Sequence, residues 1–162
     1  MIPSLFTSFL SLLLCIPAVM LAAGKSKRGR AVYSLLLLLT AILGTAVSYL
    51  CWTDGIALEL NMSGFAPVPF ALRVDRLSAF FLLLMCVVAA CVFLFSSSYI
   101  ERHYQGAQRL WSWVLLPWFL LSMVVVVTAS TAFAFLFGWE FMTLLSAGLV
   151  IIDGDSKERR HS

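Results

Sequence analysis

One carboxylate stands in the middle of a stretch of sequence that is otherwise apolar. Glu140 is the only ionisable residue between Thr131 and Ile152. If the stretch is helical, Glu140 lies roughly 13 Å along the axis from Thr131 and roughly 18 Å from Ile152. Both distances place it near the centre of a hydrocarbon layer about 30 Å thick. A charge at that depth costs at least about 2 to 3 kcal/mol. We therefore expect burial to raise the pKa of Glu140 and to favour its protonated form.

The residues one and two turns after Glu140 are small or weakly polar. Thr143, Ala147 and Gly148 are expected to share its helix face. Such a face allows another helix, or water, to approach the carboxylate. The sequence therefore predicts a proton-accepting site inside a membrane bundle. The alternative is a carboxylate that only hydrogen-bonds a neighbouring helix.

The composition places the whole chain in a membrane. Hydrophobic residues make up 62% of the 162 residues and charged residues 12%, and a soluble domain of this size could not bury so much apolar surface. We expect an all-α integral membrane protein with a single membrane domain over residues 1–162. The net charge of +3 gives no indication of nucleic-acid binding. The four cysteines form no CxxC pair and no His cluster accompanies them, so we predict packing roles, no metal and no cofactor.

Five apolar segments are long enough to cross a bilayer. They cover residues 2–23, 31–51, 77–99, 110–128 and 131–152. Pro117 lies inside the fourth segment, where it should free a backbone carbonyl in the preceding turn and bend the helix. Only a residue or two around Ser130 separates the last two segments, so we expect them to form a tight antiparallel pair.

The sequence between the second and third segments is of a different kind. Apolar and polar side chains alternate from Leu58 to Ser63 and again from Phe70 to Asp75, with one Gly and two Pro between the two runs. This pattern predicts a short β-hairpin at the membrane surface. Asp75 directly precedes the third segment and can cap that helix. We expect Arg73 and Asp75 to have a structural or interface role.

The basic residues predict the orientation of the chain in the membrane. With the N-terminus outside, nine Lys and Arg residues lie on the cytoplasmic side and only Arg73 and Arg76 on the other. Cytoplasmic loops carry the excess of positive charge. We therefore expect a multi-pass protein of the bacterial inner membrane, with its hairpin outside and its C-terminus in the cytoplasm.

Three local patterns carry a resemblance to a known family. They are V-D-R-L-S-A-F-F at 74–81, S-S-Y-I-E-R-H-Y at 97–104, and F-L-F-G-W-E-F-M-T-L-L-S-A-G-L-V at 135–150 with E-R-R at 158–160. Together they resemble the N-terminal part of proton-antiporter-like membrane subunits. Such subunits occur in respiratory complex I, in hydrogenase 4, in formate hydrogenlyase, and in multisubunit Na+/H+ antiporters. The spacing of Tyr99 and Tyr104 leans toward the hydrogenase-type branch.

The resemblance implies an architecture of about fourteen helices that contains two inverted five-helix repeats. It also implies that a glutamate in the fifth helix, which matches Glu140, pairs with a lysine in the seventh. The hairpin would contact a neighbouring subunit. This sequence stops at Ser162, and none of its five apolar segments contains a Lys or His. We therefore expect a fragment truncated after the fifth helix, or one piece of a subunit that another chain completes.

Three functions remain open from the sequence. The first is a proton-translocating part of a complex I-like NADH/quinone oxidoreductase or a membrane-bound hydrogenase, or of a Na+/H+ antiporter that moves protons or Na+. The second is a truncated structural subunit that conducts nothing. The third is a small independent membrane protein whose oligomer forms a pore around Glu140. The chain shows no catalytic or redox motif of its own. Expected partners are other membrane subunits and the lipid bilayer, and not nucleic acid.

Overall fold

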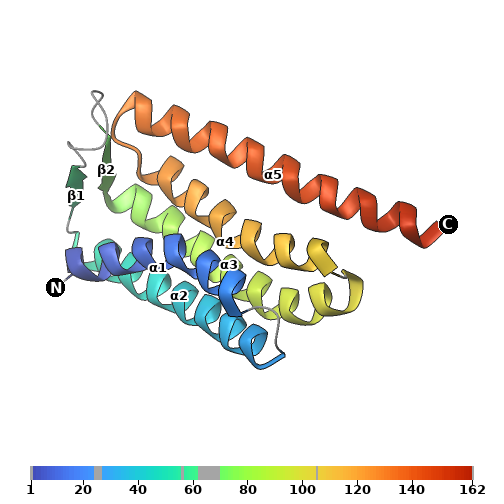
Figure 1. Ribbon diagram of the computed structural model, residues 1–162. Helices are drawn as coiled ribbons and strands as arrows, with labels where there is room; N and C mark the ends of the chain where they lie inside the picture. The colour runs from blue at the N-terminus through green and yellow to red at the C-terminus, as the bar shows by residue number, and fades with distance from the viewer. Residues whose placement is uncertain (1, 24–26, 56, 62–69, 105, 162) are drawn as a thin grey trace.

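The protein folds into five long helices and one short pair of strands (Figure 1). The computed structural model describes residues 2–23, 27–55, 57–61, 70–104 and 106–161. The elements are α1 (Ile2–Ala23), α2 (Lys27–Asp54), β1 (Leu58–Asn61), β2 (Ala71–Val74), α3 (Arg76–His103), α4 (Gly106–Thr128) and α5 (Ala132–His161). Five membrane-length apolar helices, with a two-stranded antiparallel sheet between the second and third, confirm the predicted fold class.

Several helices extend past the apolar segments that the sequence indicates. The parts of α3 and α5 that are apolar enough to span a membrane are Arg76–Ser96 and Ala132–Ile152, yet α3 continues to His103 and α5 to His161. Hydropathy detects only the part of a helix suited to lipid. Charged residues such as Glu, Lys and Arg are good helix formers, so the helix continues into the polar flank.

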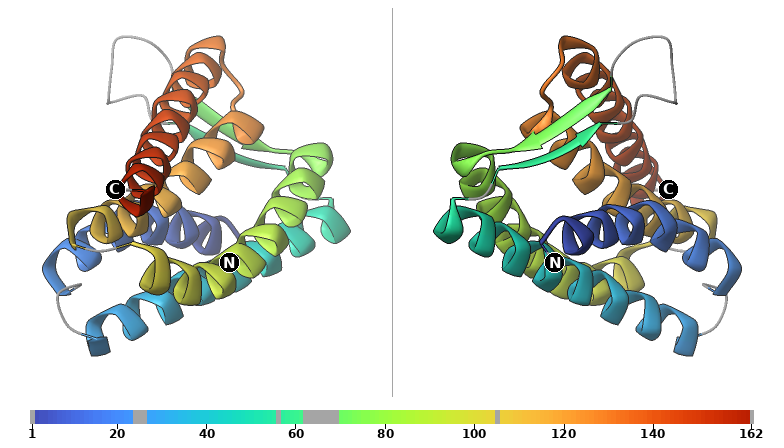
Figure 2. Two further views of the ribbon diagram at one scale, coloured as in Figure 1. Left: turned by 90° about the vertical axis from the view of Figure 1, so that its right-hand side faces the viewer. Right: turned by 90° about the vertical axis from the view of Figure 1, so that its left-hand side faces the viewer.

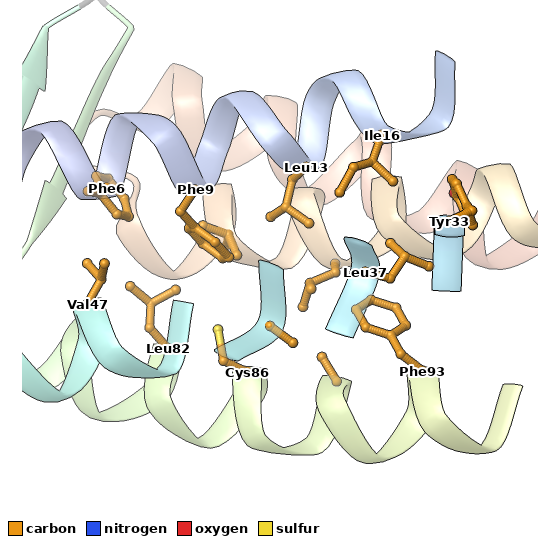
Figure 3. Packing of buried hydrophobic residues seen from close by; sticks show 14 of the residues in the cluster. Phe6, Phe9, Leu13, Ile16, Tyr33, Leu37, Val47, Leu82, Cys86 and Phe93 are labelled. Carbon is orange, nitrogen blue, oxygen red and sulfur yellow. The ribbon is translucent and has the colours of Figure 1, made fainter. Parts of the chain in front are cut away.

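Helices α1 to α4 pack together, and α5 lies on the outside against α4 (Figures 1 and 2). The core between α1, α2 and α3 is apolar (Figure 3). Its side chains include Phe6, Phe9, Leu13, Ile16, Leu37, Val47, Leu82, Cys86 and Phe93. Gly44 allows this close packing, because a Cβ at that position would lie 2.6 Å from both Cys86 Sγ and Phe9 Cε2.

The hairpin follows the alternation read from the sequence. Leu58 pairs with Val74 and Asn61 with Ala71 in an antiparallel register. Leu58, Leu72 and Val74 are buried, so one face of the strands packs on the helices. The predicted turn of the hairpin, residues 62–69, lies outside the described residues.

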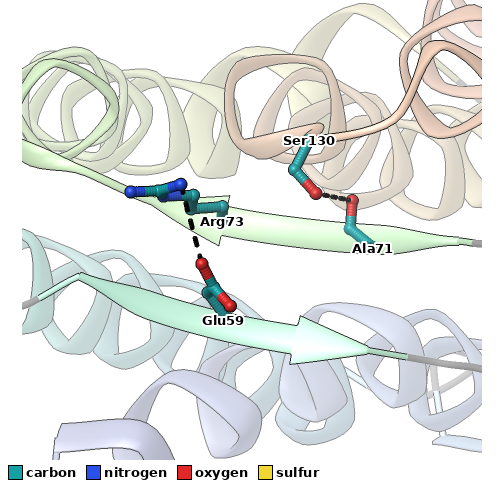
Figure 4. Close-up of polar contacts among 4 residues, drawn as sticks. All are labelled: Glu59, Ala71, Arg73 and Ser130. Atoms are coloured by element: carbon teal, nitrogen blue, oxygen red, sulfur yellow. Dashed lines mark hydrogen bonds and ion pairs between the residues drawn. The ribbon is translucent and has the colours of Figure 1, made fainter.

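The hairpin is also joined to the corner between α4 and α5 (Figure 4). Leu72 forms an isolated antiparallel bridge with Ala129. The backbone N–H of Ser130 donates to the Ala71 carbonyl at 3.0 Å, and the Ser130 hydroxyl donates to the same oxygen at 3.1 Å. The start of α5 is therefore held to the strand that leads into α3.

Along its length, α5 contacts α4 through one stripe of side chains. The stripe consists of Ala134, Gly138, Phe141, Leu145 and Gly148, which are buried or half-buried. Steps of four and three residues place these side chains on one helix face, as in a coiled coil. Gly138 is the closest point, since a Cβ there would lie 2.9 Å from Val125 Cγ1 and 3.0 Å from Val126 Cγ2.

We expect Gly138→Ala to weaken the contact between α4 and α5. The added methyl group would overlap two stiff β-branched side chains and press on the Val126 backbone N–H, 3.3 Å away. Overpacking of this kind costs about 1 to 3 kcal/mol. Gly148→Ala is the matched control, because among the described residues outside its own helix turn a Cβ there would meet only Leu115 Cδ1 at 3.3 Å, the end of a flexible side chain. Thermal unfolding in lipid should show a clearly larger loss for Gly138→Ala. Equal losses would contradict the assigned contact.

Candidate functional site

Glu140 lies near the middle of the membrane-length part of α5, Ala132–Ile152, on the face that points away from α4. A second stripe runs along this face and consists of Leu136, Glu140, Thr143, Ala147 and Val150, again in steps of four and three residues. All five are exposed, with 60% of Leu136 and 71% of Val150 accessible. We call this set the open stripe. It has the spacing of a helix-packing seam, but no described helix occupies it.

The structure does not confirm the expectation that Glu140 lies buried inside the bundle, since its side chain is exposed on the outside of the described helices. Glu140 is two positions after Gly138, so its side chain is turned about 200° around the helix axis from the packed stripe. Only 11% of the α5 span is buried, against 28–39% of the other four spans. Among the side chains that the structure describes, no charged one is buried. Gly148, expected beside Glu140, is half-buried against Leu115 instead.

The surroundings of Glu140 are apolar or already hydrogen-bonded. The Thr143 hydroxyl donates to the Glu140 backbone carbonyl at 2.8 Å, so it is engaged within its own helix. Trp139 and Leu144 beside it are exposed, at 48% and 69%. Within the described ranges, no basic side chain lies within ion-pair distance of the Glu140 carboxylate. A lone carboxylate at membrane depth is costly, so this face is where a further partner would stabilise the protein.

Asp75 forms the N-cap of α3. Its carboxylate accepts a hydrogen bond from the Ser78 backbone N–H at 2.7 Å, and its backbone is extended, as the cap position requires. The pKa of Asp75 is lowered, first by this backbone hydrogen bond, then by the Ser78 hydroxyl, with a smaller effect from the positive charge of Arg73. The structure thus shows the cap that the sequence indicates.

Arg73 lies on β2, two positions before Asp75, and faces Glu59 on β1 across the hairpin (Figure 4). The two charged groups are 3.6 Å apart, and both side chains are more than half exposed. An exposed pair of this kind contributes about 0 to 1 kcal/mol. The position of Arg73 and Asp75 at the junction between hairpin and helix is compatible with an interface role, which stays a prediction.

Sequence reasoning did not single out the serines that join this junction to α4. The Ser78 hydroxyl donates to the Val127 carbonyl at 3.0 Å, and Ser130 reaches Ala71 as described above. Both serines lie at a boundary of an apolar segment. Ser78 reaches one of the last free carbonyls of α4, and Ser130 reaches a carbonyl of β2. The only signal in the sequence is a small polar residue at a span boundary, and that signal is common.

The described residues show no arrangement suited to metal binding. Within them, no three His, Cys, Asp or Glu side chains cluster as ligands. Cys51 and Cys86 are buried in the helix packing, whereas Cys15 and Cys91 are exposed on the outside of the helices.

Five helices of membrane-spanning length, with a strand pair before the third, are the features of a multi-pass membrane protein. Residues 60–109 match the family described as the N-terminus of chain 5 of NADH-ubiquinone oxidoreductase (complex I). The matched residues include β2, α3 and the start of α4, with Arg73 and Asp75. Glu140 lies outside them.

Two similar proteins extend this comparison. An uncharacterized protein of Mycobacterium tuberculosis is 32% identical over 80 residues, which are 49% of this chain and 12% of that protein. A Staphylococcus saprophyticus protein named as an antiporter subunit, mnhA2, is 32% identical over 85 residues, 52% of this chain and 10% of its own length. The aligned region is thus a small part of either relative. The matches confirm the resemblance to the N-terminal part of proton-antiporter-like membrane subunits.

We expect Asp75→Ala to lower the free energy of unfolding by about 1 kcal/mol at neutral pH, because it removes the cap of α3. Asp75→Asn is the control, since an amide oxygen can accept the same bond from Ser78. The folded-state pKa of Asp75 lies below its usual value of 3.8. The stability from its charge is therefore present above that value and is lost as the pH falls through the folded-state pKa.

Thermal unfolding of the three proteins at neutral and acidic pH tests this prediction. The extra stability of the wild type over Asp75→Ala should shrink on acidification. The extra stability of Asp75→Asn over Asp75→Ala should change little, because an amide does not titrate. A loss in Asp75→Asn as large as in Asp75→Ala would show that the charge of Asp75, and not its role as an acceptor, stabilises the junction.

Proposed function

We propose that this chain is part of a proton-translocating membrane subunit of a complex I-like oxidoreductase or a membrane-bound hydrogenase. Glu140 is the carboxylate that exchanges a proton. The observation that carries the proposal is the position of Glu140 in the open stripe, at mid-span and without a described partner. Acids at membrane depth generally face a protein interior or a water-filled path and serve transport.

The open stripe is shaped to receive another helix. Thr143 and Ala147, directly after Glu140, are small, and small residues let two helix backbones approach closely in lipid. A helix that carries a Lys or Arg at this level would supply the missing charge. A cation close to a carboxylate favours its charged form, and removal of the cation favours the protonated form. A movement of that helix would thus switch Glu140 between release and uptake of a proton.

The proposal includes an arrangement in the membrane. The nine cytoplasmic Lys and Arg of the preferred orientation put the hairpin and the corner at Ser130 on the outer side of a bacterial inner membrane. Since β2 already pairs with this corner, a neighbouring subunit that binds the hairpin would also act on the start of α5. Other membrane subunits of a multisubunit complex are the proposed partners.

A second candidate is a part in a multisubunit Na+/H+ antiporter. The name of the staphylococcal relative favours it. Glu140 would be the ion-exchanging residue there as well, because a carboxylate can take up H+ and its oxygens can also coordinate Na+. A dependence of transport on Na+ in the assembled complex would favour the antiporter. Transport driven by electron transfer would favour the oxidoreductase.

We expect Glu140→Gln in the assembled complex to abolish most proton translocation while assembly is retained. Gln has nearly the shape of Glu, cannot exchange a proton, and is less costly to place in a membrane. Glu59→Gln is the matched control, since Glu59 is an exposed strand residue whose pairing with Arg73 is weak. Proton uptake into vesicles that contain each purified complex gives the readout. Undiminished uptake with Glu140→Gln would refute the proposed role of Glu140.

A further inference from the structure

The proline inside α4 leaves one backbone carbonyl without its helical partner. Pro117 has no N–H, so the carbonyl four residues earlier, that of Trp113, receives no i to i−4 hydrogen bond. The Tyr33 hydroxyl on α2 donates to this carbonyl at 2.7 Å. The bond is buried, and Tyr33 and Trp113 are each only 1% exposed. A side chain from another helix thus replaces the hydrogen bond that the proline removes.

Ring packing holds the Tyr33 hydroxyl in place. The Tyr33 and Trp113 rings meet edge to face, with centroids 5.6 Å apart and planes at 85°. They are the two largest of the fully buried side chains among the described residues. Figure 3 shows Tyr33 at one end of the packed core, beside Leu37 and Phe93. Neighbouring helices, Ser or Thr side chains, ordered water or a local change of helix geometry can satisfy a carbonyl that a proline frees in a membrane helix. Here the donor is the Tyr33 hydroxyl of a neighbouring helix.

The segment of α4 that follows the proline is the one that supports α5 nearest Glu140. Val125 and Val126 lie against Gly138, two residues before Glu140. The Trp118 ring lies beside that of Phe141, the residue after Glu140, with centroids 6.0 Å apart. A change in the path of α4 at Pro117 would therefore displace the middle of α5. The corner at Ser130 holds only the start of that helix.

We propose that Tyr33 is a positioning residue: its hydroxyl fixes the path of α4 at Pro117 and, through α4, the place of Glu140 in the membrane. The consequence for proton exchange rests on the proposed function, whereas the effect on helix position does not. Tyr33 lies on a different helix from Glu140 and acts only through α4. Sequence spacing gives no sign of this link, since Tyr33 and Trp113 are 80 residues apart.

A double-mutant cycle with Tyr33→Phe and Pro117→Ala tests the link in the full chain in lipid nanodiscs. Tyr33→Phe keeps the ring and leaves the Trp113 carbonyl unsatisfied, so it should lower the ratio of folded to unfolded protein by roughly five- to thirtyfold. Pro117→Ala restores a backbone N–H at position 117 that can bond this carbonyl. In that background, Tyr33→Phe should change the ratio by less than about twofold. Tyr49→Phe, at an exposed site on α2, is the control and should have little effect.

The four proteins of the cycle are the wild type, the two single variants and the double variant. They give a second readout that a general loss of packing would not produce. Spin labels at Leu39 of α2 and Leu144 of α5, both exposed, report the distance between these helices after Cys15 and Cys91 are replaced by Ala. We expect Tyr33→Phe to shift or broaden this distance and the double variant to restore it. An unchanged distance in Tyr33→Phe would overturn the proposal, as would an equal loss of stability in both backgrounds. If Tyr33→Phe alone does not fold, the double variant still should, and its failure would also overturn the proposal. Neither readout depends on transport, so the outcome is independent of the test of Glu140.

Discussion

A polar group at membrane depth has to find its partner within the protein, because hydrocarbon offers none. Most of this chain meets that requirement locally. Thr40, Ser48 and Thr128 each donate to the carbonyl four residues earlier in their own helix. The carbonyl freed by Pro117 needs a partner from elsewhere and finds it in the Tyr33 hydroxyl. The buried indole N–H groups of Trp113 and Trp118 have no hydrogen-bond partner among the described residues. Glu140 also has none, and it is the acidic side chain at mid-span.

Helix α5 has two stripes with the spacing of a packing seam, and only one of them contacts a described helix. On that stripe, Ala134, Gly138 and Leu145 pack against α4, and Gly138 makes the closest approach. The open stripe, which includes Glu140, is left unoccupied by the five helices. The acid therefore lies on an outer face of the described helices and not at their centre. A carboxylate on such a face responds to the position of a neighbouring helix, which is what a proton switch coupled to helix movement requires.

Local patterns in the sequence predicted the fold well because they depend on neighbouring residues. Apolar length gave five helices, alternation gave the strands near Leu58 and Leu72, and an acid before an apolar run gave the cap at Asp75. The exposure of Glu140 could not be predicted in the same way. Because α5 is apolar on nearly every side, hydropathy does not tell which face meets α4. The bonds of Tyr33 and Ser130 join residues 80 and 59 positions apart, and no periodicity reports such contacts.

The central claim is that Glu140 takes up and releases a proton within the membrane. Infrared difference spectra of the assembled complex between two pH values measure this most directly, because a protonated carboxyl group shielded from water has its own C=O stretching band. The account predicts a band that grows as the pH falls in the wild type and is absent in Glu140→Gln. Difference spectra that are the same in the wild type and in Glu140→Gln would contradict it.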